Sequence, residues 1–171
     1  MDEFWVFGYG SLMWNPGFRH EERQIAVAHG YHRALCVRSW VHRGTEQRPG
    51  LVLGLDRGGA CKGVAFRIRP EDWNEVIGYL RERELVTRVY VEKTISIRFP
   101  DGSRRDALTY VIDRGHKQYA GALSVAEAAA IVRGAVGKSG PNEDYLLATL
   151  AHMREIGIND PFLEGVAESI G

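Results

Sequence analysis

A glycine-bearing turn near the N-terminus is the first segment whose residue types suit a chemical role. The apolar run 4–7 predicts a short buried strand, and the segment Gly8-Tyr9-Gly10-Ser11-Leu12-Met13 follows it. Such a turn can point successive backbone N–H groups into a concavity that binds a carboxylate or stabilises a carbonyl oxygen as it gains charge. The alternative is a purely structural turn. A dinucleotide-binding fingerprint is excluded, because Met13 stands where its third glycine belongs and no βαβ unit follows.

A carboxylate at the end of a predicted helix is the second candidate. Pro70 and the acids after it predict a helix start, and one apolar face follows from Trp73, Val76, Ile77 and Leu80. Glu84 comes four residues after Leu80 and continues this face, whereas Glu82 points away from it. A carboxylate turned toward the core is costly to ionise, which suits a general acid/base. If the helix ends before Glu84, these charges form a solvated face instead.

Other reactive residue types lack the spacing for metal binding or covalent catalysis. No histidine pair has metal-ligand spacing with a cysteine or carboxylate in register; the histidines are His20, His29, His32, His42, His116 and His152. Ser11 does not stand in a G-x-S-x-G elbow, and neither Cys36 nor Cys61 has a nearby histidine that would mark it as a nucleophile. The sequence therefore predicts no metal and no cofactor, and both cysteines are predicted to be reduced core residues.

Length and composition indicate an ordinary globular protein. The 171 residues suit a single domain over 1–171, and 44% are hydrophobic. Lysine plus arginine (22) balance aspartate plus glutamate (22), which disfavours nucleic acid as a partner. The N-terminus has no signal-peptide pattern and no run reaches the ~18 apolar residues of a membrane span. We therefore expect no membrane partner and a cytoplasmic location.

Strand patterns dominate the first part of the chain. Residues 25–37 form β-like stretches broken at Gly30. Residues 51–55 and 61–68 are predicted to pair as a hairpin through Asp56-Arg57-Gly58-Gly59. A second hairpin joins 89–99 to 107–112 through Pro100-Asp101-Gly102.

Helix signals dominate the second part. Ser124 and Glu127 form a capping box before the alanine-rich stretch 126–136. Asn142 is predicted to cap a third helix, and Asp160-Pro161 opens a short last one. Strands followed by helices favour an α+β domain, a mostly antiparallel sheet or small barrel flanked by helices.

The segment Trp5-Val6-Phe7-Gly8-Tyr9-Gly10-Ser11-Leu12-Met13-Trp14-Asn15-Pro16-Gly17-Phe18 resembles the opening signature of the ChaC family, the glutathione-specific γ-glutamylcyclotransferases. The resemblance runs to about Ile158. It continues through Ser39, His42-Arg43-Gly44-Thr45, Pro49-Gly50-Leu51-Val52, Gly63-Val64-Ala65, Tyr79-Leu80-Arg81-Glu82-Arg83-Glu84, His116, Tyr119 and Gly140-Pro141-Asn142-Glu143-Asp144-Tyr145-Leu146.

This resemblance implies a small β-barrel surrounded by helices and an enzyme that splits glutathione into 5-oxoproline and cysteinylglycine. It implies that the turn Tyr9-Gly10-Ser11-Leu12 binds the γ-glutamyl group and that Glu84 is the acid/base. Ser39 and Arg43 are carried over as further substrate-binding residues. Tyr145, in the first turn of the helix that Asn142 opens, is predicted to add a hydroxyl, with packing as its alternative role.

One departure from the family pattern follows Glu84. Several members have a Gly-Gly-Tyr segment where this chain has Leu85-Val86-Thr87-Arg88-Val89-Tyr90, which bears on substrate preference more than on reaction type. Two alternatives therefore stay open: a cyclotransferase for another γ-glutamyl-amine or conjugate, and a non-catalytic γ-glutamyl-binding module.

Overall fold

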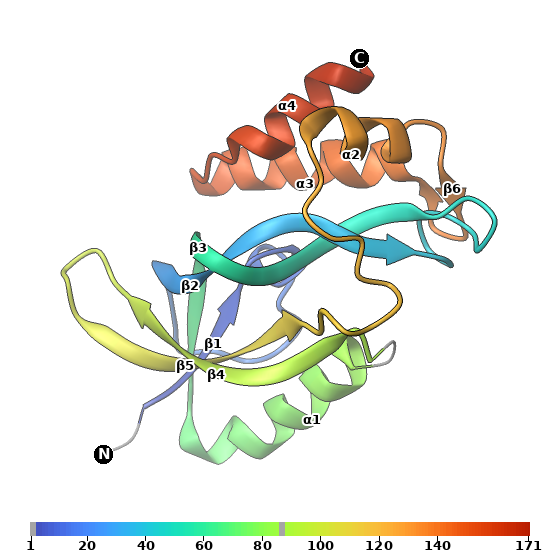
Figure 1. Ribbon diagram of the computed structural model, residues 1–171. Coiled ribbons are helices and arrows are strands. Elements are labelled where there is room, and N and C mark those ends of the chain that lie inside the picture. The colour runs from blue at the N-terminus through green and yellow to red at the C-terminus, as the bar shows by residue number, and fades with distance from the viewer. Residues whose placement is uncertain (1–2, 86–87) are drawn as a thin grey trace. The chain divides into compact units, whose positions relative to one another are not determined.

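The computed structural model describes residues 3–85 and 88–171, and the chain divides into two compact units (Figure 1). The first unit comprises residues 1–33 and 55–113, and the second comprises 34–54 and 114–171. The prediction of one domain over residues 1–171 stays a prediction. The elements are β1 (Phe4–Gly8), η1 (Ser11–Met13), β2 (Glu22–Ser39), β3 (Gly50–Ile68), η2 (Pro70–Asp72), α1 (Trp73–Glu84), β4 (Tyr90–Arg98), β5 (Arg104–Ile112), α2 (Val125–Val132), β6 (Val136–Gly137), β7 (Gly140–Pro141), α3 (Asn142–Ile156) and α4 (Pro161–Ile170).

A closed β-barrel with the strand order β1-β3-β2-β4-β5 confirms the predicted α+β class. β1 pairs antiparallel with β3 and parallel with β5, so the barrel is mixed but mostly antiparallel. The predicted hairpin of β4 and β5 is confirmed, in register from Tyr90 opposite Ile112 to Arg98 opposite Arg104. Closure pairs the first and last strands of this five-stranded sheet with each other.

Helix α1 belongs to the first unit and packs there through the apolar face that the sequence predicted. Val76 and Leu80 are buried, and the Trp73 ring stacks on Phe4 of β1 with the ring centroids 4.9 Å apart. The helix begins after the 3-10 turn at Pro70 and reaches Glu84. The prediction of a helix that includes Glu84 is therefore confirmed.

The predicted hairpin between residues 51–55 and 61–68 is wrong, because β3 is one continuous strand. Gly58 (φ 102°) and Gly59 (φ 71°) have the positive φ angles expected of a turn, yet they lie within the strand. His32 of β2 contacts the Gly58 carbonyl through Nδ1 at 2.9 Å, so these glycines face a neighbouring strand. β2 likewise continues through Gly30 (φ 87°), where the sequence predicted a break. Pairing with neighbouring strands keeps both segments extended.

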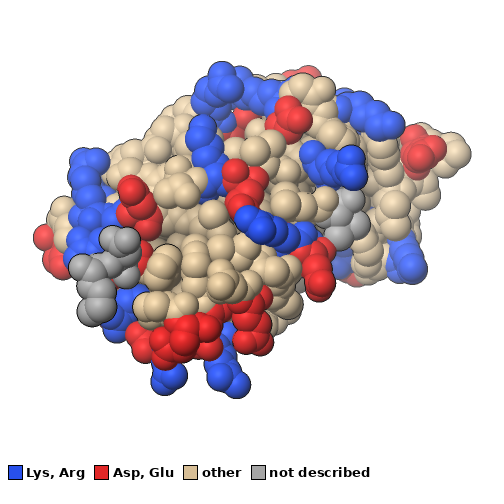
Figure 2. All heavy atoms as spheres, turned by 90° about the horizontal axis from the view of Figure 1, so that it is seen from below, with Lys and Arg blue, Asp and Glu red and all other residues tan. Residues whose placement is uncertain are grey.

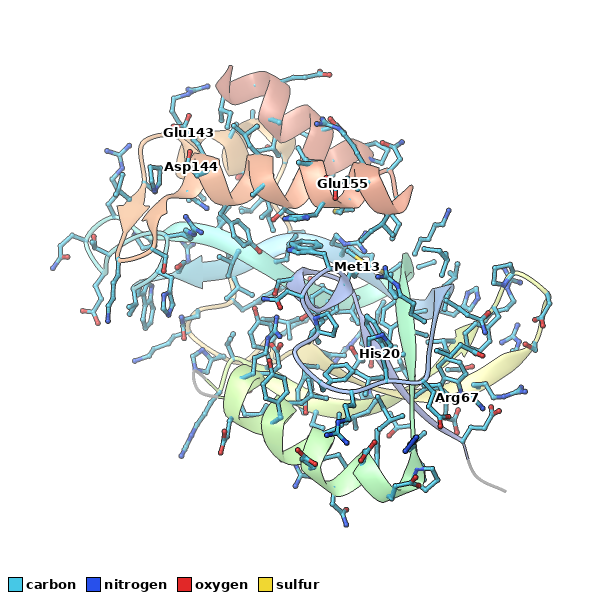
Figure 3. The ribbon with its side chains drawn as sticks, turned by 180° about the vertical axis from the view of Figure 1, so that it is seen from behind. Met13, His20, Arg67, Glu143, Asp144 and Glu155 are labelled. Carbon is cyan, nitrogen blue, oxygen red and sulfur yellow. The ribbon has the colours of Figure 1, made fainter. Side chains whose placement is uncertain are left out.

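The second unit contains α2, α3 and α4. The Ser124–Glu127 capping box is present, and Asp160 Oδ1 accepts a hydrogen bond from Leu163 N at 3.1 Å, so both predicted helix starts are confirmed. The first of these helices ends at Val132, short of the predicted stretch to 136. At the start of α3, Figure 3 labels the acidic side chains Glu143 and Asp144, which are favourable at the positive end of a helix dipole.

Asn142 does not cap α3, so that prediction is wrong. The N-cap is Pro141, and the Asn142 side chain is fully buried. Its Oδ1 accepts from Leu51 N at 2.8 Å and its Nδ2 donates to Leu51 O at 2.9 Å. The amide thus pairs with both backbone groups of one residue in β3, a partner that local sequence does not reveal.

Basic and acidic side chains are interspersed on the face shown in Figure 2. Cys36 and Cys61 are both buried, as predicted for core thiols. Among the described residues, no helix combines the length and the apolar character needed to cross a bilayer.

Two glycines of the first unit should respond oppositely to replacement by alanine. A Cβ at Gly63 would clash with the Gly8 carbonyl oxygen and lie 2.7 Å from the Phe7 ring, so Gly63→Ala should lower the free energy of unfolding by about 1–3 kcal/mol. A Cβ at Gly78 of α1 would meet nothing within 4 Å, so Gly78→Ala should raise the free energy of unfolding by about 1 kcal/mol. Urea denaturation of both variants measures the difference, and equal effects would contradict the close strand approach at Gly63.

Candidate active site

The turn after β1 presents backbone donors that the fold does not use. The 3-10 helix η1 is closed by Met13 N donating to Gly10 O at 2.9 Å, while Asn15 N donates to Ser11 O at 2.7 Å. Among the residues that the structure describes, no acceptor faces the N–H groups of Gly10, Ser11 or Leu12. The first N–H groups of a helix are left without intrahelical partners, and they bind anionic or carbonyl oxygens readily.

Arg33 of β2 supports this turn through its buried side chain, and sequence reasoning missed it. The side chain is 9% exposed. Its Nε donates to Tyr9 O at 2.6 Å, and its Nη2 donates to Lys62 O at 2.7 Å. Nη2 also lies 3.8 Å from the sulfur of Met13, which is labelled in Figure 3. The guanidinium therefore connects the turn to β3.

Glu84 is the last residue of α1, and its carboxyl group is largely removed from solvent. The Glu84 side chain is 18% exposed, whereas the Glu82 side chain on the same helix is exposed to solvent. Burial raises the pKa of the Glu84 carboxyl above its ordinary value, and the positive charge of Arg83 lowers it in part. This environment suits a group that takes up and releases a proton during a reaction.

Arg83 connects Glu84 to the turn, and it is a second residue that sequence reasoning missed. Its Nη2 donates to Ser11 Oγ at 2.9 Å, and its Nε lies 3.5 Å from Glu84 Oε1. The turn and the carboxyl group are thus contacts of the same guanidinium. The sequence signal for this role was the position of Arg83, four residues after Tyr79 and next to the apolar face of the helix. In the structure, Tyr79 Oη accepts a hydrogen bond from Arg83 Nη1 at 3.1 Å.

A second charged network lies beside Glu84. Arg81 donates to both carboxyl oxygens of Glu92 at 3.0 Å, and the Tyr110 hydroxyl donates to Glu92 Oε1 at 2.9 Å. The hydrogen bonds from Arg81 hold the pKa of Glu92 below its ordinary value. Burial and the neighbouring Glu92 raise the pKa of Tyr110, and the charge of Glu84 raises it further. Tyr110 is therefore a neutral hydroxyl within electrostatic range of Glu84.

The second unit brings three other predicted site residues together. Arg43 N donates to Ser39 Oγ at 2.9 Å, and the Arg43 guanidinium lies 5.7 Å from the centroid of the Tyr145 ring. Arg43 Nη1 also donates to Ser139 O at 2.9 Å. The Tyr145 hydroxyl accepts from Leu53 N at 3.0 Å. These contacts give each side chain a structural role, and their part in substrate binding stays a prediction.

Val86 and Thr87, at the centre of the departure from the family pattern, lie outside the described residues; Arg88 has a left-handed backbone (φ 61°).

Within residues 3–85 and 88–171, no group of three or more histidine, cysteine, aspartate or glutamate side chains is placed to hold a metal ion.

Comparison with known proteins gives consistent matches over almost the whole chain. The family model described as ChaC-like protein matches residues 4–171. The glutathione-specific gamma-glutamylcyclotransferase of Escherichia coli is 32% identical, over 97% of this chain and 72% of the relative. Glutathione-specific gamma-glutamylcyclotransferase 1 of Mus musculus is 34% identical, over 98% of this chain and 78% of the relative. The crystal structure of a yeast gamma-glutamyl cyclotransferase specific to glutathione has the same fold, with a TM-score of 0.86, 22% identity and coverage of 99% and 96% of the two chains.

Proposed function

The chain belongs to the ChaC-like protein family, and from this premise we propose that it is a γ-glutamylcyclotransferase that degrades glutathione to 5-oxoproline and cysteinylglycine. The relatives named above are glutathione-specific enzymes, and they match at or above 32% identity over nearly all of this chain. The reaction is an intramolecular acyl transfer in which the substrate supplies its own amine nucleophile.

The proposed reaction needs one proton carrier and no protein nucleophile. The α-amine of the γ-glutamyl group attacks its own γ-carbonyl carbon and forms a five-membered ring. The amide bond to the cysteine nitrogen then breaks, and that nitrogen leaves with a proton. The amine loses one proton in the same sequence, so a single carboxyl group can take the proton from one nitrogen and deliver it to the other.

We assign this proton transfer to Glu84, and the observation that carries the assignment is its shielded carboxyl group, which contacts the same Arg83 guanidinium as the turn. The raised pKa from burial makes the carboxylate a better proton acceptor than an exposed glutamate, while it remains able to ionise because Arg83 is near. Tyr110 and Glu92 are less suited, since Tyr110 is held neutral and Glu92 is engaged by Arg81.

We assign binding of the γ-glutamyl group to the turn Tyr9-Gly10-Ser11-Leu12. The N–H groups of Gly10, Ser11 and Leu12 face no acceptor among the described residues, so they are available to the developing oxyanion or to the α-carboxylate. Each donor of an oxyanion site typically contributes ~3 kcal/mol to transition-state stabilisation.

Incubating the purified protein with glutathione should release 5-oxoproline and cysteinylglycine in equal amounts, measured by mass spectrometry. A panel of γ-glutamyl-amines and other γ-glutamyl conjugates run in parallel reports substrate preference. If 5-oxoproline is released only from a different γ-glutamyl compound, that compound, and not glutathione, is the substrate. Calorimetric binding of glutathione without any product would favour a non-catalytic γ-glutamyl-binding module and reject the enzyme.

A further inference from the structure

The Arg83 guanidinium makes polar contacts through all three of its nitrogens. Its side chain is 21% exposed, and every terminal nitrogen has a partner. Nη2 donates to Ser11 Oγ at 2.9 Å, and Nε faces Glu84 Oε1 at 3.5 Å. Nη1 donates to Asn15 O at 2.7 Å, to Pro16 O at 3.2 Å and to Tyr79 Oη at 3.1 Å. A planar guanidinium with donors on several sides can make such a set of contacts, whereas a lysine ammonium cannot.

The ion pair of Arg83 with Glu84 is loose, in contrast to the close pair that Arg81 of the same helix forms with Glu92 of β4. Arg81 holds Glu92 through two hydrogen bonds of 3.0 Å, and the pKa of Glu92 is lowered. Arg83 instead directs its terminal nitrogens to the turn and approaches Glu84 only at 3.5 Å, and burial keeps the pKa of Glu84 raised. Glu84 is therefore held near a positive charge without being committed to a tight ion pair.

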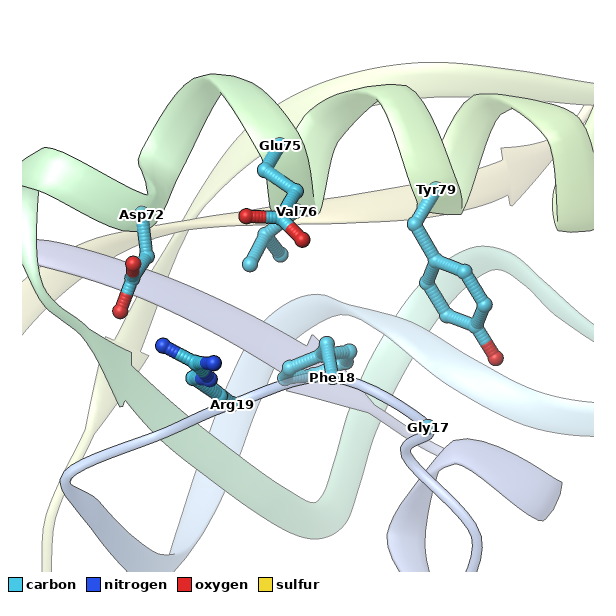
Figure 4. A pocket seen from close by; sticks show the side chains of 7 residues that line it. All are labelled: Gly17, Phe18, Arg19, Asp72, Glu75, Val76 and Tyr79. Carbon is cyan, nitrogen blue, oxygen red and sulfur yellow. The ribbon is translucent and has the colours of Figure 1, made fainter.

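The loop that Arg83 contacts also lies against Tyr79 of the same helix. Tyr79 lines a cavity of about 430 Å³ between α1 and the loop, together with Gly17, Phe18 and Asp72 (Figure 4). A Cβ at Gly17 (φ 73°) would clash with the Tyr79 hydroxyl, so the loop passes directly against this ring. Tyr79 thus orients the Arg83 guanidinium and packs against the loop at the same time.

We propose that Arg83 is a positioning residue of the reaction, whose guanidinium holds the Ser11–Pro16 segment and the Glu84 carboxyl group in a fixed relation. The inference rests on the proposed function, since it assigns Glu84 and the turn their roles. Arg83 acts through these groups and need not touch the substrate. Among the described residues, the ionisable groups that act on Glu84 are Arg83 on α1 and Tyr110 on β5, and Tyr110 bonds to Glu92 on β4, which Arg81 on α1 contacts.

Kinetics of Arg83→Met and Arg83→Lys on glutathione test the proposal. Both variants should lower kcat by about 10- to 100-fold with a smaller change in KM, because misplacing reacting groups by about 1 Å costs up to ~100-fold. In Arg83→Met the acidic limb of the kcat/KM profile should move to higher pH, because loss of a positive charge makes Glu84 harder to ionise. In Arg83→Lys, which keeps the charge, the limb should stay closer to its original pH while kcat stays low.

Arg69→Met is the matched control, because Arg69 lies in the same unit and forms an exposed ion pair with Glu21 at 3.1 Å. It should leave kcat and the pH profile unchanged. Wild-type kcat and an unshifted acidic limb in Arg83→Met would overturn the inference while the proposed function stands.

Amide hydrogen exchange of Met13, Trp14 and Asn15, whose N–H groups bond to carbonyl oxygens within the turn, gives a readout that does not need turnover. Exchange should be faster in both Arg83 variants than in wild type and Arg69→Met, whether or not the wild-type protein cleaves glutathione. Unchanged exchange would overturn the positioning role. An inactive wild-type protein with faster exchange in the variants would instead reject the proposed function and leave the structural part of the inference intact.

Discussion

Replacing Glu84 by glutamine is expected to lower turnover on glutathione at least ~100-fold while the protein stays folded. Glutamine keeps the shape of the side chain but cannot take a proton from the α-amine or return one to the departing nitrogen. Substrate binding should change less than turnover, because the donors of the turn remain. Release of 5-oxoproline by the two proteins at saturating glutathione measures the effect.

Glu82→Gln is the control for this variant, because Glu82 lies two residues away on the same helix and is exposed. It should retain turnover within about 2-fold, as expected for a surface substitution. Near wild-type turnover in Glu84→Gln, or an equal loss in Glu82→Gln, would reject Glu84 as the acid/base.

The difference in the free energy of unfolding between Glu84→Gln and wild type is expected to depend on pH. A carboxyl whose pKa is raised by folding destabilises the folded protein when it is ionised, that is, above its folded pKa. The variant should therefore be more stable than wild type to urea at pH 8, and the difference should disappear below the ordinary glutamate pKa. Lower stability of the variant at pH 8 would show that the ionised carboxyl is favourably paired in the folded state.

Replacing Arg33 by methionine is expected to lower the free energy of unfolding by about 2–4 kcal/mol, since buried acceptors without donors cost about 1–3 kcal/mol each. The carbonyl oxygens of Tyr9 and Lys62 lose their Arg33 donors, and methionine fills most of the volume. The turn should also lose its fixed position, so turnover on glutathione should fall with stability. Urea denaturation followed by tryptophan fluorescence measures the first effect.

Arg23→Met provides the comparison, because Arg23 is in the same strand but exposed, with its guanidinium 5.9 Å from the Phe66 ring centroid. Its free energy of unfolding should change by less than about 1 kcal/mol. Equal losses in the two variants would mean that the buried contacts of Arg33 do not determine the stability of the turn.

Features that depend on neighbours in the sequence were predictable. The Ser124–Glu127 capping box and the Asp160 cap occur as predicted, because a cap binds an N–H group only two or three residues away. The Pro100-Asp101-Gly102 hairpin formed for the same reason. The helical period also predicted which glutamate of α1 is shielded, since residues four apart share a face.

Features that depend on distant partners were not predictable. Gly58 and Gly59 have turn-like φ angles, but β3 stays extended because it pairs with β1 and β2. Asn142 has the residue type of a cap, yet its amide is bound to Leu51, which is 91 residues away in the sequence. Glycine and asparagine permit several local conformations, so tertiary contacts select among them.

The sequence by itself determined the turn, the helix that ends at Glu84 and the family to which both belong, because residue types and short-range spacing carry that information. Only the tertiary structure decided that Arg33 lies buried beneath the turn and that Arg83 links the turn to Glu84. An arginine is long and flexible, and its residue type predicts a solvated side chain. Its direction is set by which carbonyl oxygens the folded chain brings within reach, and those lie 24 and 68 residues away in the sequence.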